Sequence, residues 1–400
     1  LVLDRLVNSI RLAGFTLLAA CNYESGERAL ERGDEARAAE IWEPLARRGD
    51  MRAAMALARL DSGADATPAE LDEAEHELQR VLRFGQDWQK GWAYYELARV
   101  ERQRGRLAEA AAHYEEAMER GVEWAAYDLG QLLAEGRGVP QDPARAVRLT
   151  EEAADEGVAP AMTAMGTFYA DGIGVAADPE AARDWYEKAA AAGDPWGRFA
   201  LGQLLLAADR EAADSETSEP DLAGAAAAFE AAVAEDIVQA KRPLADLLLP
   251  LDSATAEVVP PDPDRAVALY TEAAADGDAW ASYRLAEIYA NGRLGQADMA
   301  LAAKHYAAAA DDGIGLAARA LGRLYETGEG VPADPARAAA YYTAAAAEGD
   351  TDAVLGLTRL ARLPEPPPID TARVLRQLEA AVDESPDIAR LLGEINLAGE

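Results

Sequence analysis

One short motif returns along the whole chain at an interval of about one helical hairpin. It is a leucine or methionine followed by glycine or alanine, and successive copies lie 32 to 43 residues apart, with several gaps of 36. A period of this size is typical of stacked helix pairs, in which no pair can bury its apolar face alone. The copies begin at Leu57, Leu97, Leu129, Met165, Leu201, Leu244, Leu285, Leu321, Leu355 and Leu392.

The clearest copy, residues 161–194, predicts two helices. Apolar residues recur at steps of three and four, with Met165 and Phe168 in the first half and Trp185 and Tyr186 in the second. This spacing places one apolar stripe on each helix. The glycine that follows Met165 lets neighbouring helices approach closely, and the aromatic side chains fill the gaps between them.

The ends of both helices in this copy are also marked in the sequence. We expect Gly172 and Gly174 to end the first helix. Asp178 followed by Pro179 gives the second helix an N-cap and a proline in its first position. Gly193 then closes the second helix.

Residues 129–143 and 321–350 carry the same glycine loop and Asp-Pro pair. Together with residues 161–194, they resemble the Sel1-like repeat, a variety of the tetratricopeptide class with a longer glycine-bearing loop. Copies before Leu97 lack that loop and resemble plainer tetratricopeptide hairpins. The resemblance implies an all-α fold, a right-handed superhelical α-solenoid in which residues 21–400 form one domain of about ten repeats.

Three segments interrupt the repeats. Residues 209–221 are polar and acidic, and residues 252–264 contain three prolines, so we expect both to be long surface loops. Residues 363–369 contain four prolines and predict a stiff, extended spacer before the last helices.

The chain is strongly acidic, with 38 lysines and arginines against 72 aspartates and glutamates and a formal charge of −34. Phosphates would be repelled by such a surface, which excludes nucleic acid as a partner. The surplus favours a solvated acidic face that acts on solubility and association rather than on the fold.

Residues 1–20 have the pattern of a secretory signal. Arg5 and Arg11 flank the start of an apolar run over residues 12–20, which ends in small residues before the expected cleavage point. Nine helical residues reach only about 14 Å, which is too short to cross a hydrocarbon core of about 30 Å. We therefore expect residues 1–20 to be removed rather than to span a membrane.

Residues 18–21, Leu-Ala-Ala-Cys, resemble the bacterial lipobox. The resemblance implies cleavage between Ala20 and Cys21, acylation of the Cys21 thiol and then of its freed amine, and a lasting anchor made by several acyl chains. Asn22 in place of aspartate implies the outer membrane. The alternative is that Cys21, the single cysteine of the chain, is an ordinary buried thiol in a first helix.

No residue pattern predicts catalysis, a cofactor or a metal site. His76, His113 and His305 lie in different repeats without a metal-ligand partner at helical spacing, and His305 stands where other repeats place a packing aromatic. The glycine groups lack the Lys-Ser that follows a phosphate-binding loop, so we expect them to link helices. Carboxylate pairs are too common here to indicate hydrolysis.

Five tryptophans near predicted helix starts leave two interpretations open. One or two of them face a groove and stack on a sugar or peptide, or they pack between helices. Trp185, in contrast, falls at a packing position. The five are Trp88, Trp92, Trp124, Trp196 and Trp280.

A lipobox followed by tetratricopeptide and Sel1-like repeats is similar to the outer-membrane scaffold lipoproteins of bacterial alginate biosynthesis. Residues 29–75, with Ala29-Leu30 and Gly33-Asp34, and residues 288–310, followed by the loop at residues 328–330, carry the resemblance. It implies a non-catalytic, periplasm-facing scaffold of a Gram-negative bacterium. Such a scaffold helps localise the export porin and holds together the periplasmic proteins that modify and export the polymer.

Two other functions remain open at this point. One is a general Sel1-type adaptor or regulator of other envelope proteins, which fits the same repeats. The other is an enzyme such as a cysteine-rich Sel1 hydrolase, and a single cysteine argues against it.

Overall fold

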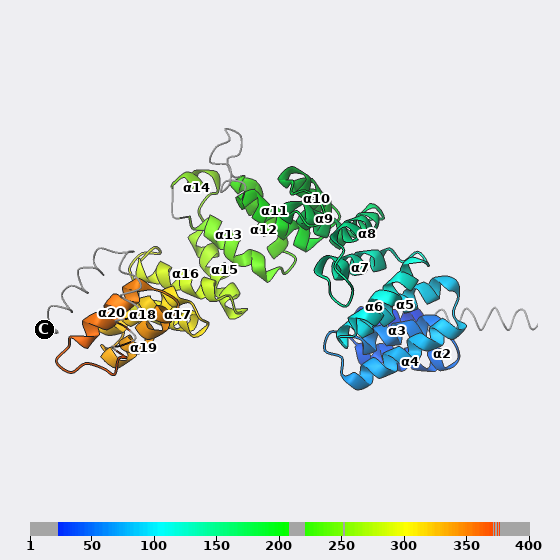
Figure 1. The fold of residues 1–400 in the computed structure, drawn as a ribbon, viewed down its shortest axis with the longest axis horizontal. Helices are drawn as coiled ribbons and strands as arrows, with labels where there is room; N and C mark the ends of the chain where they lie inside the picture. Colours follow the sequence, from blue (N-terminus) through cyan, green and yellow to red (C-terminus); the bar gives the residue numbers. More distant parts are fainter. Residues whose placement is uncertain are drawn as a thin grey trace, which may run out of the picture. The chain divides into compact units, whose positions relative to one another are not determined.

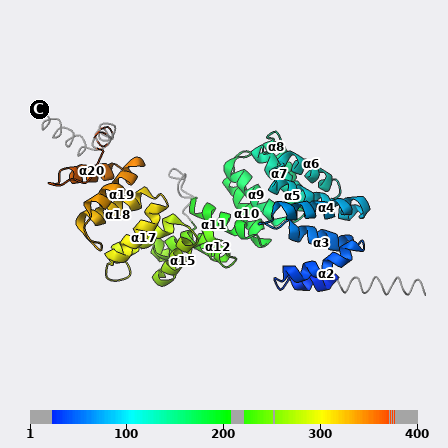
Figure 2. The same ribbon diagram turned by 90° about the horizontal axis from the view of Figure 1, so that it is seen from below.

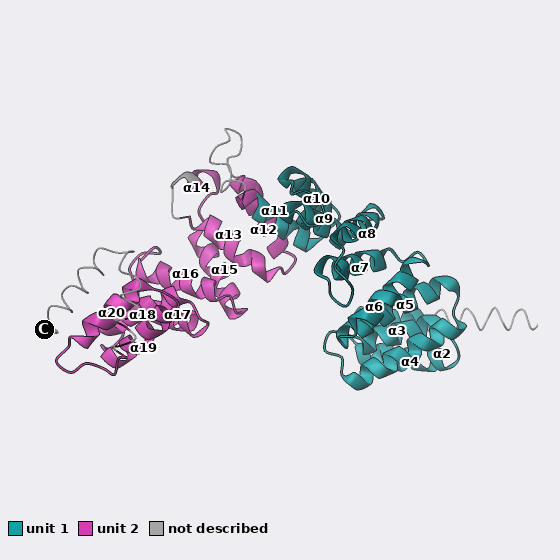
Figure 3. Cartoon of the chain, in the orientation of Figure 1, with its two compact units in different colours: residues 1–204 teal, residues 205–400 magenta. Residues whose placement is uncertain are grey.

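The computed structural model describes residues 23–207, 221–250, 253–370, 372, 374 and 376. Within these residues all regular structure is helical, which confirms the all-α prediction (Figures 1 and 2). The chain divides into two compact units, with the boundary between Leu204 and Leu205 (Figure 3). Each unit is a stack of helical hairpins, so the fold is an α-solenoid.

In unit 1, consecutive helices from α2 to α10 pack on one another, and residues 23–30 are also helical. The pairs α3 with α4, α5 with α6, α7 with α8 and α9 with α10 are the hairpins. The bounds are α2 (Glu35–Arg47), α3 (Met51–Asp61), α4 (Pro68–Phe84), α5 (Asp87–Gln103), α6 (Leu107–Met118), α7 (Glu123–Glu135), α8 (Pro143–Asp155), α9 (Ala159–Asp171), α10 (Pro179–Ala191) and α11 (Pro195–Ala207), whose last residues cross the unit boundary.

Unit 2 repeats the plan, with hairpins α13 with α15, α16 with α17 and α18 with α19. The bounds are α12 (Leu222–Val233), the 3-10 helix η1 (Val238–Ala240), α13 (Lys241–Leu248), α14 (Ser253–Val258), α15 (Pro263–Ala275), α16 (Ala279–Ala290), α17 (Met299–Asp311), α18 (Gly315–Thr327), α19 (Pro335–Ala347) and α20 (Thr351–Ala361).

The three segments expected to interrupt the repeats have different outcomes in the structure. Residues 252–264, expected to be a loop, contain the short helix α14 between the two helices of a hairpin. Residues 363–369 contain no helix. Of residues 209–221, only Asp221 is among the described residues, and its side chain caps α12 by accepting a hydrogen bond from the Gly224 backbone N–H.

The helix ends predicted for residues 161–194 are confirmed. Helix α9 ends at Gly172, whose φ of 70° lies in the left-handed region that glycine adopts without strain. The Asp178 carboxylate accepts from the backbone N–H groups of Glu180 and Ala181 at 3.1 Å each, and Pro179 is the first residue of α10. The aspartate therefore satisfies N–H groups that the first turn leaves without a partner.

In three of the loops the second glycine makes the contact between one hairpin and the preceding one, whereas a Cβ at Gly295, in the loop between α16 and α17, would meet nothing within 4 Å. A Cβ added at Gly174 would overlap the carbonyl of Pro143, the first residue of α8 in the preceding hairpin. Gly138 lies in the same way against Leu107 of α6, and Gly330 against Met299 of α17. Only a residue without a side chain lets the loop rest on the preceding helix.

A third glycine position lets the two helices of one hairpin meet. A Cβ at Gly166 of α9 would lie 2.5 Å from the Tyr186 ring of α10, and one at Gly322 of α18 would lie 2.8 Å from the Tyr342 ring of α19. These tyrosines are buried, at 6% and 1% exposed. The alternation of small and large residues predicted from the sequence thus fills the interior of each hairpin.

We predict that Gly174→Ala destabilises the stack more than Gly193→Ala. Both glycines have positive φ, 71° and 89°, but a Cβ at Gly193 meets nothing within 4 Å. The shared cost of the left-handed conformation is about 1 kcal/mol, and displacement of the Pro143 carbonyl adds about 1–3 kcal/mol at Gly174. The free energy of unfolding from urea titration followed by circular dichroism measures both. Equal losses would show that the loop contact does not hold the hairpins together.

Candidate functional site

A groove of about 500 Å³ runs along the first helices of successive hairpins in unit 2, α16, α18 and α20. Most of its lining comes from repeat positions that recur every 36 residues, so each hairpin presents the same few positions to it. We call it the unit 2 groove. These positions place Tyr283, Arg319 and Leu355 in one row, Glu287, Arg323 and Arg359 in a second row, and Leu316 and Asp352 in a third.

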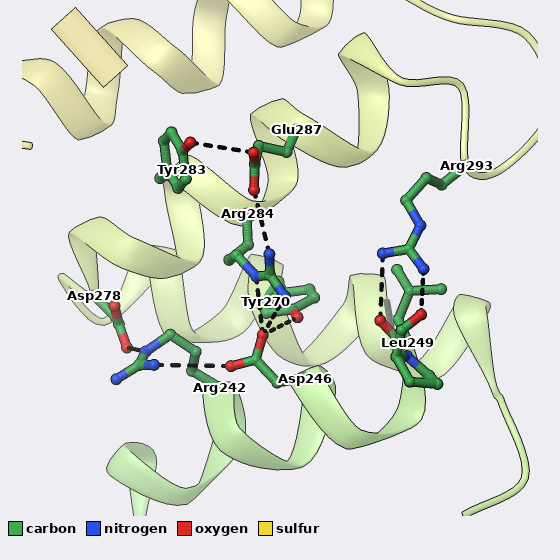
Figure 4. Close-up of polar contacts among 10 residues, drawn as sticks. Arg242, Asp246, Leu249, Tyr270, Asp278, Tyr283, Arg284, Glu287 and Arg293 are labelled. Atoms are coloured by element: carbon green, nitrogen blue, oxygen red, sulfur yellow. Dashed lines mark hydrogen bonds and ion pairs between the residues drawn. The ribbon is translucent and has the colours of Figure 1, made fainter. Parts of the chain in front are cut away.

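A polar network holds the α16 wall of the unit 2 groove (Figure 4). The Asp246 carboxylate on α13 accepts from the Tyr270 hydroxyl at 2.7 Å and from Arg284 Nε at 2.9 Å. Arg284 also pairs with Glu287 at 3.2 Å, and the Tyr283 hydroxyl donates to Glu287 at 3.1 Å. Burial, together with the charge of Glu287, raises the pKa of Tyr283 to about 12. Tyr283 is thus neutral and a donor at neutral pH.

A second polar cluster joins α18 to α20. Glu326 of α18 accepts from Arg359 Nε and Nη2, both at 2.9 Å, and from the Tyr342 hydroxyl at 2.6 Å. The hydrogen bonds from Arg359 hold the pKa of Glu326 below its usual value. This two-pronged geometry suits a guanidinium and a carboxylate, and it fixes the Arg359 side chain.

Two arginines line the centre of the groove, and they differ in their ion pairs. Arg319 lies 3.3 Å from Asp350 and also pairs with Asp352. Arg323 is exposed and makes no ion pair with any residue that the structure describes. Among the residues that the structure describes, no carboxylate therefore offsets the charge of the Arg323 guanidinium.

Ion pairs between first helices also occur in unit 1. Arg59 of α3 pairs with Glu96 of α5 at 2.6 Å, although the Glu96 side chain is only 2% exposed. Arg102 of α5 pairs with Asp128 of α7 at 2.9 Å. Burying a charge is costly unless a partner of opposite sign is close, so these pairs fix the register between neighbouring hairpins.

The tryptophans predicted near helix starts divide into two groups. Trp92 packs edge-on against Tyr95 with ring centroids 5.7 Å apart. The other four are each the second residue of a first helix and are 39–53% exposed. Two of these four also pack edge-on, Trp196 against Phe199 and Trp280 against Tyr283, so packing within the helix accounts for part of their surface and stacking on a sugar or peptide stays a prediction. The exposed four are Trp88, Trp124, Trp196 and Trp280.

A smaller recess of about 250 Å³ lies beside one of these tryptophans, in unit 1. Trp196 and Tyr127 form part of its lining, and Gln131, Thr163 and Asp194 supply polar groups. The Asp194 carboxylate accepts from Thr163 and from the Gly197 backbone N–H, so it caps α11. Its carboxylate is therefore already engaged in holding the helix start.

Two histidines pack on tyrosines, His113 on Tyr94 and His305 on Tyr289, whereas His76 is exposed. His305 stacks on Tyr289 with centroids 5.6 Å apart and an interplanar angle of 14°, as expected for a filling residue. Burial, with a smaller effect of Lys304, lowers its pKa. In the part of the chain that the structure describes, no three His, Cys, Asp or Glu side chains gather to hold a metal ion. The glycine loops join helices, as the sequence predicts.

The N-terminal predictions fall outside the described residues. The structure does not describe Ala20 and Cys21, the expected cleavage and lipidation positions. Of the helices that are described, none combines the length and the apolar character that a membrane span requires.

Sequence reasoning missed the arginines of the unit 2 groove. Arg323 and Arg359 are one period of 36 residues apart, and Glu287 precedes them by the same interval. The exposed charged residues therefore share the period of the apolar ones, and this shared period is the sequence signal for the groove.

Asp61, the last residue of α3, has a pKa well above the usual value of an aspartate. Its partial burial, with the charges of Glu73, Glu70 and other glutamates nearby, raises its pKa to about 6. Between about pH 4 and pH 6, Asp61 is therefore mostly protonated in the folded chain and mostly ionised in the unfolded chain. Because the folded state binds more protons there, the free energy of unfolding falls as the pH rises through this window.

We predict that Asp61→Asn stabilises the protein at pH 7 by about 1 kcal/mol, a value reduced for solvent screening. The gain should shrink as the pH falls and be mostly lost at pH 4.5, as measured by urea unfolding at each pH. Asp65→Asn, which removes the same charge from an exposed position nearby, is the control. A gain that is independent of pH, or equal in both variants, would contradict the assignment.

The comparisons with known proteins agree with this architecture. The Sel1 repeat model matches residues 125–158, 159–194, 256–278, 281–314 and 315–350, so these segments are Sel1 repeats, as predicted for the three clearest copies. A search of curated proteins finds no match to the chain.

Two solved structures share the fold. The crystal structure of c5321, described as a protective antigen present in uropathogenic Escherichia coli strains and displaying an SLR fold, has a TM-score of 0.65 and 22% identity, and the match covers 98% of this chain and 82% of that one. A Sel1 repeat protein from Oxalobacter formigenes has a TM-score of 0.55 and 24% identity over 89% of this chain and 90% of that one. At these identities the likeness shows the fold alone.

Proposed function

We propose that this chain, a Sel1-repeat protein, is a non-catalytic scaffold that is lipid-anchored to the outer membrane and assembles an exopolysaccharide modification and export complex, with alginate as the polymer. Repeat solenoids are suited to protein–protein interaction because they present extended surfaces to partners. The observation that carries the scaffold function is the unit 2 groove, which extends over three first helices and presents polar, charged and apolar side chains together.

The anchor rests on the amino-terminal sequence. The charged start, the short apolar run and the residues Leu18, Ala19, Ala20 and Cys21 match what the lipid-transfer and cleavage steps require. Acyl chains on Cys21 would hold the scaffold at the periplasmic face of the outer membrane.

The identity of the complex rests on the resemblance to scaffold lipoproteins of alginate biosynthesis. The partners proposed on this basis are the outer-membrane export porin and the periplasmic proteins that modify the polymer. A general Sel1-repeat adaptor of the envelope is the competing function, and it is the one that remains if polymer export does not depend on this protein.

We predict that deletion of the gene lowers polymer secretion and displaces the porin from the outer membrane, because the assembly point is lost. Secreted uronic acid and the porin content of fractionated membranes measure the two effects. Restoring the wild-type gene is the control. Unchanged secretion together with unchanged porin location would contradict the proposed complex and leave the general adaptor.

We predict that cells fed a palmitate analogue label the wild-type protein and not Cys21→Ala, because the variant lacks the thiol that receives the lipid. Ser25→Ala, a substitution close to the expected cleavage point, serves as the matched control and should label normally. Equal labelling of Cys21→Ala and the wild type would contradict lipidation at Cys21.

A further inference from the structure

The unit 2 groove differs in charge from the chain that carries it. The chain has a formal charge of −34, yet α18 and α20 bring Arg319, Arg323 and Arg359 to one groove. We propose that the unit 2 groove binds a short acidic and partly apolar peptide segment of a partner protein, and that Arg323 pairs with a carboxylate of that segment. This deepens the proposed scaffold function and rests on its protein-binding part.

The first step of the argument is the pairing of the arginines. Arg319 and Arg323 are four residues apart on α18, where like charges destabilise a helix. The charge of Arg319 is offset by Asp350 and Asp352. Arg323 has no such partner among the described residues, so its N–H donors are available to a ligand. A guanidinium presents a planar fork of donors that matches a carboxylate.

The second step is the surface around Arg323. Tyr306 of α17 lines the groove, and no described residue accepts a hydrogen bond from its hydroxyl, so it is a further donor to an anion. Leu316, which is 38% exposed, and Leu355 supply apolar surface from α18 and α20. Aromatic and arginine side chains next to apolar surface are typical of the residues that dominate binding at protein interfaces.

The third step concerns where the carboxylate lies. Glu287, held in the network of Figure 4, lines the groove on the α16 side, and Asp352 lines it on the α20 side. Glu287 is already paired with Arg284 and Asp352 with Arg319, so these positions offer no cation to an incoming carboxylate and Arg323 does. The groove therefore selects the position of the charge as well as its sign.

The fourth step favours a short segment over a long polyanion. The remainder of the chain is acidic, and a polymer charged along its length would meet repulsion beyond the groove. A segment with one or two carboxylates beside an apolar side chain gains the contact with Arg323 without that cost. Salt should weaken the interaction, because the charges meet at an exposed surface.

A library of random twelve-residue peptides displayed on phage, selected on the full chain, tests the proposal. We expect the enriched peptides to be net acidic and to carry an apolar residue next to an acidic one. Fluorescence polarisation with a labelled enriched peptide should show at least about tenfold weaker binding by Arg323→Glu. Arg323→Lys, which keeps the charge and loses the fork, should bind with intermediate affinity.

Arg148→Glu is the matched control. It makes the same charge change at an exposed position on α8 in unit 1, and it should bind within about twofold of the wild type. Circular dichroism of each variant checks that the helices remain. Enrichment of neutral or basic peptides, no enrichment at all, or equal loss in Arg323→Glu and Arg148→Glu would overturn the proposal.

Two outcomes separate this proposal from others. A concentration-dependent dimer, seen by sedimentation and abolished by Arg323→Glu, would contradict it by making a second copy of the chain the occupant. Failure of the peptide selection while gene deletion still displaces the porin would end the groove proposal and leave the scaffold function in place.

Discussion

The close approach of three glycine loops to the helix before each of them is the contact on which the stacking of their hairpins depends. Gly138, Gly174 and Gly330 each rest on the first residue of a helix in the preceding hairpin, where a side chain would collide with the neighbouring residue. Because the contact falls at the same place in these three repeats, it sets the spacing between each of them and the preceding hairpin. Buried alanines and tyrosines then fill the space that this spacing leaves.

Regular stacking also explains how a binding surface arises. When hairpins repeat at a constant interval, residues at one repeat position form a row across the first helices. In unit 2 the rows bring tyrosine, leucine and arginine side chains into one groove. Ion pairs such as Arg284 with Asp246 and Arg359 with Glu326 hold the wall residues in place. The same period thus serves both stability and recognition.

The sequence predicts the fold well because its strongest signals act locally. The caps at Asp178 and Gly172 and the small residue at Gly166 each depend on neighbours within one hairpin or the next. The groove was harder to predict. The role of Arg323 depends on which acidic side chains reach its neighbours, and α14 interrupts a segment whose prolines indicated only a loop. Pairing between exposed side chains leaves no periodic trace that distinguishes a free arginine from a paired one.

The most direct measurement of the central claim is hydrogen–deuterium exchange on the full chain with and without an acidic peptide enriched by selection on that chain. If the first helices form the working surface, protection should be largest in α16, α18 and α20, which supply most of the groove lining, and smaller in α17 and α19, which supply only Met299, Tyr306 and Tyr342. Protection confined to α17 and α19, or an unchanged α18, would contradict the account.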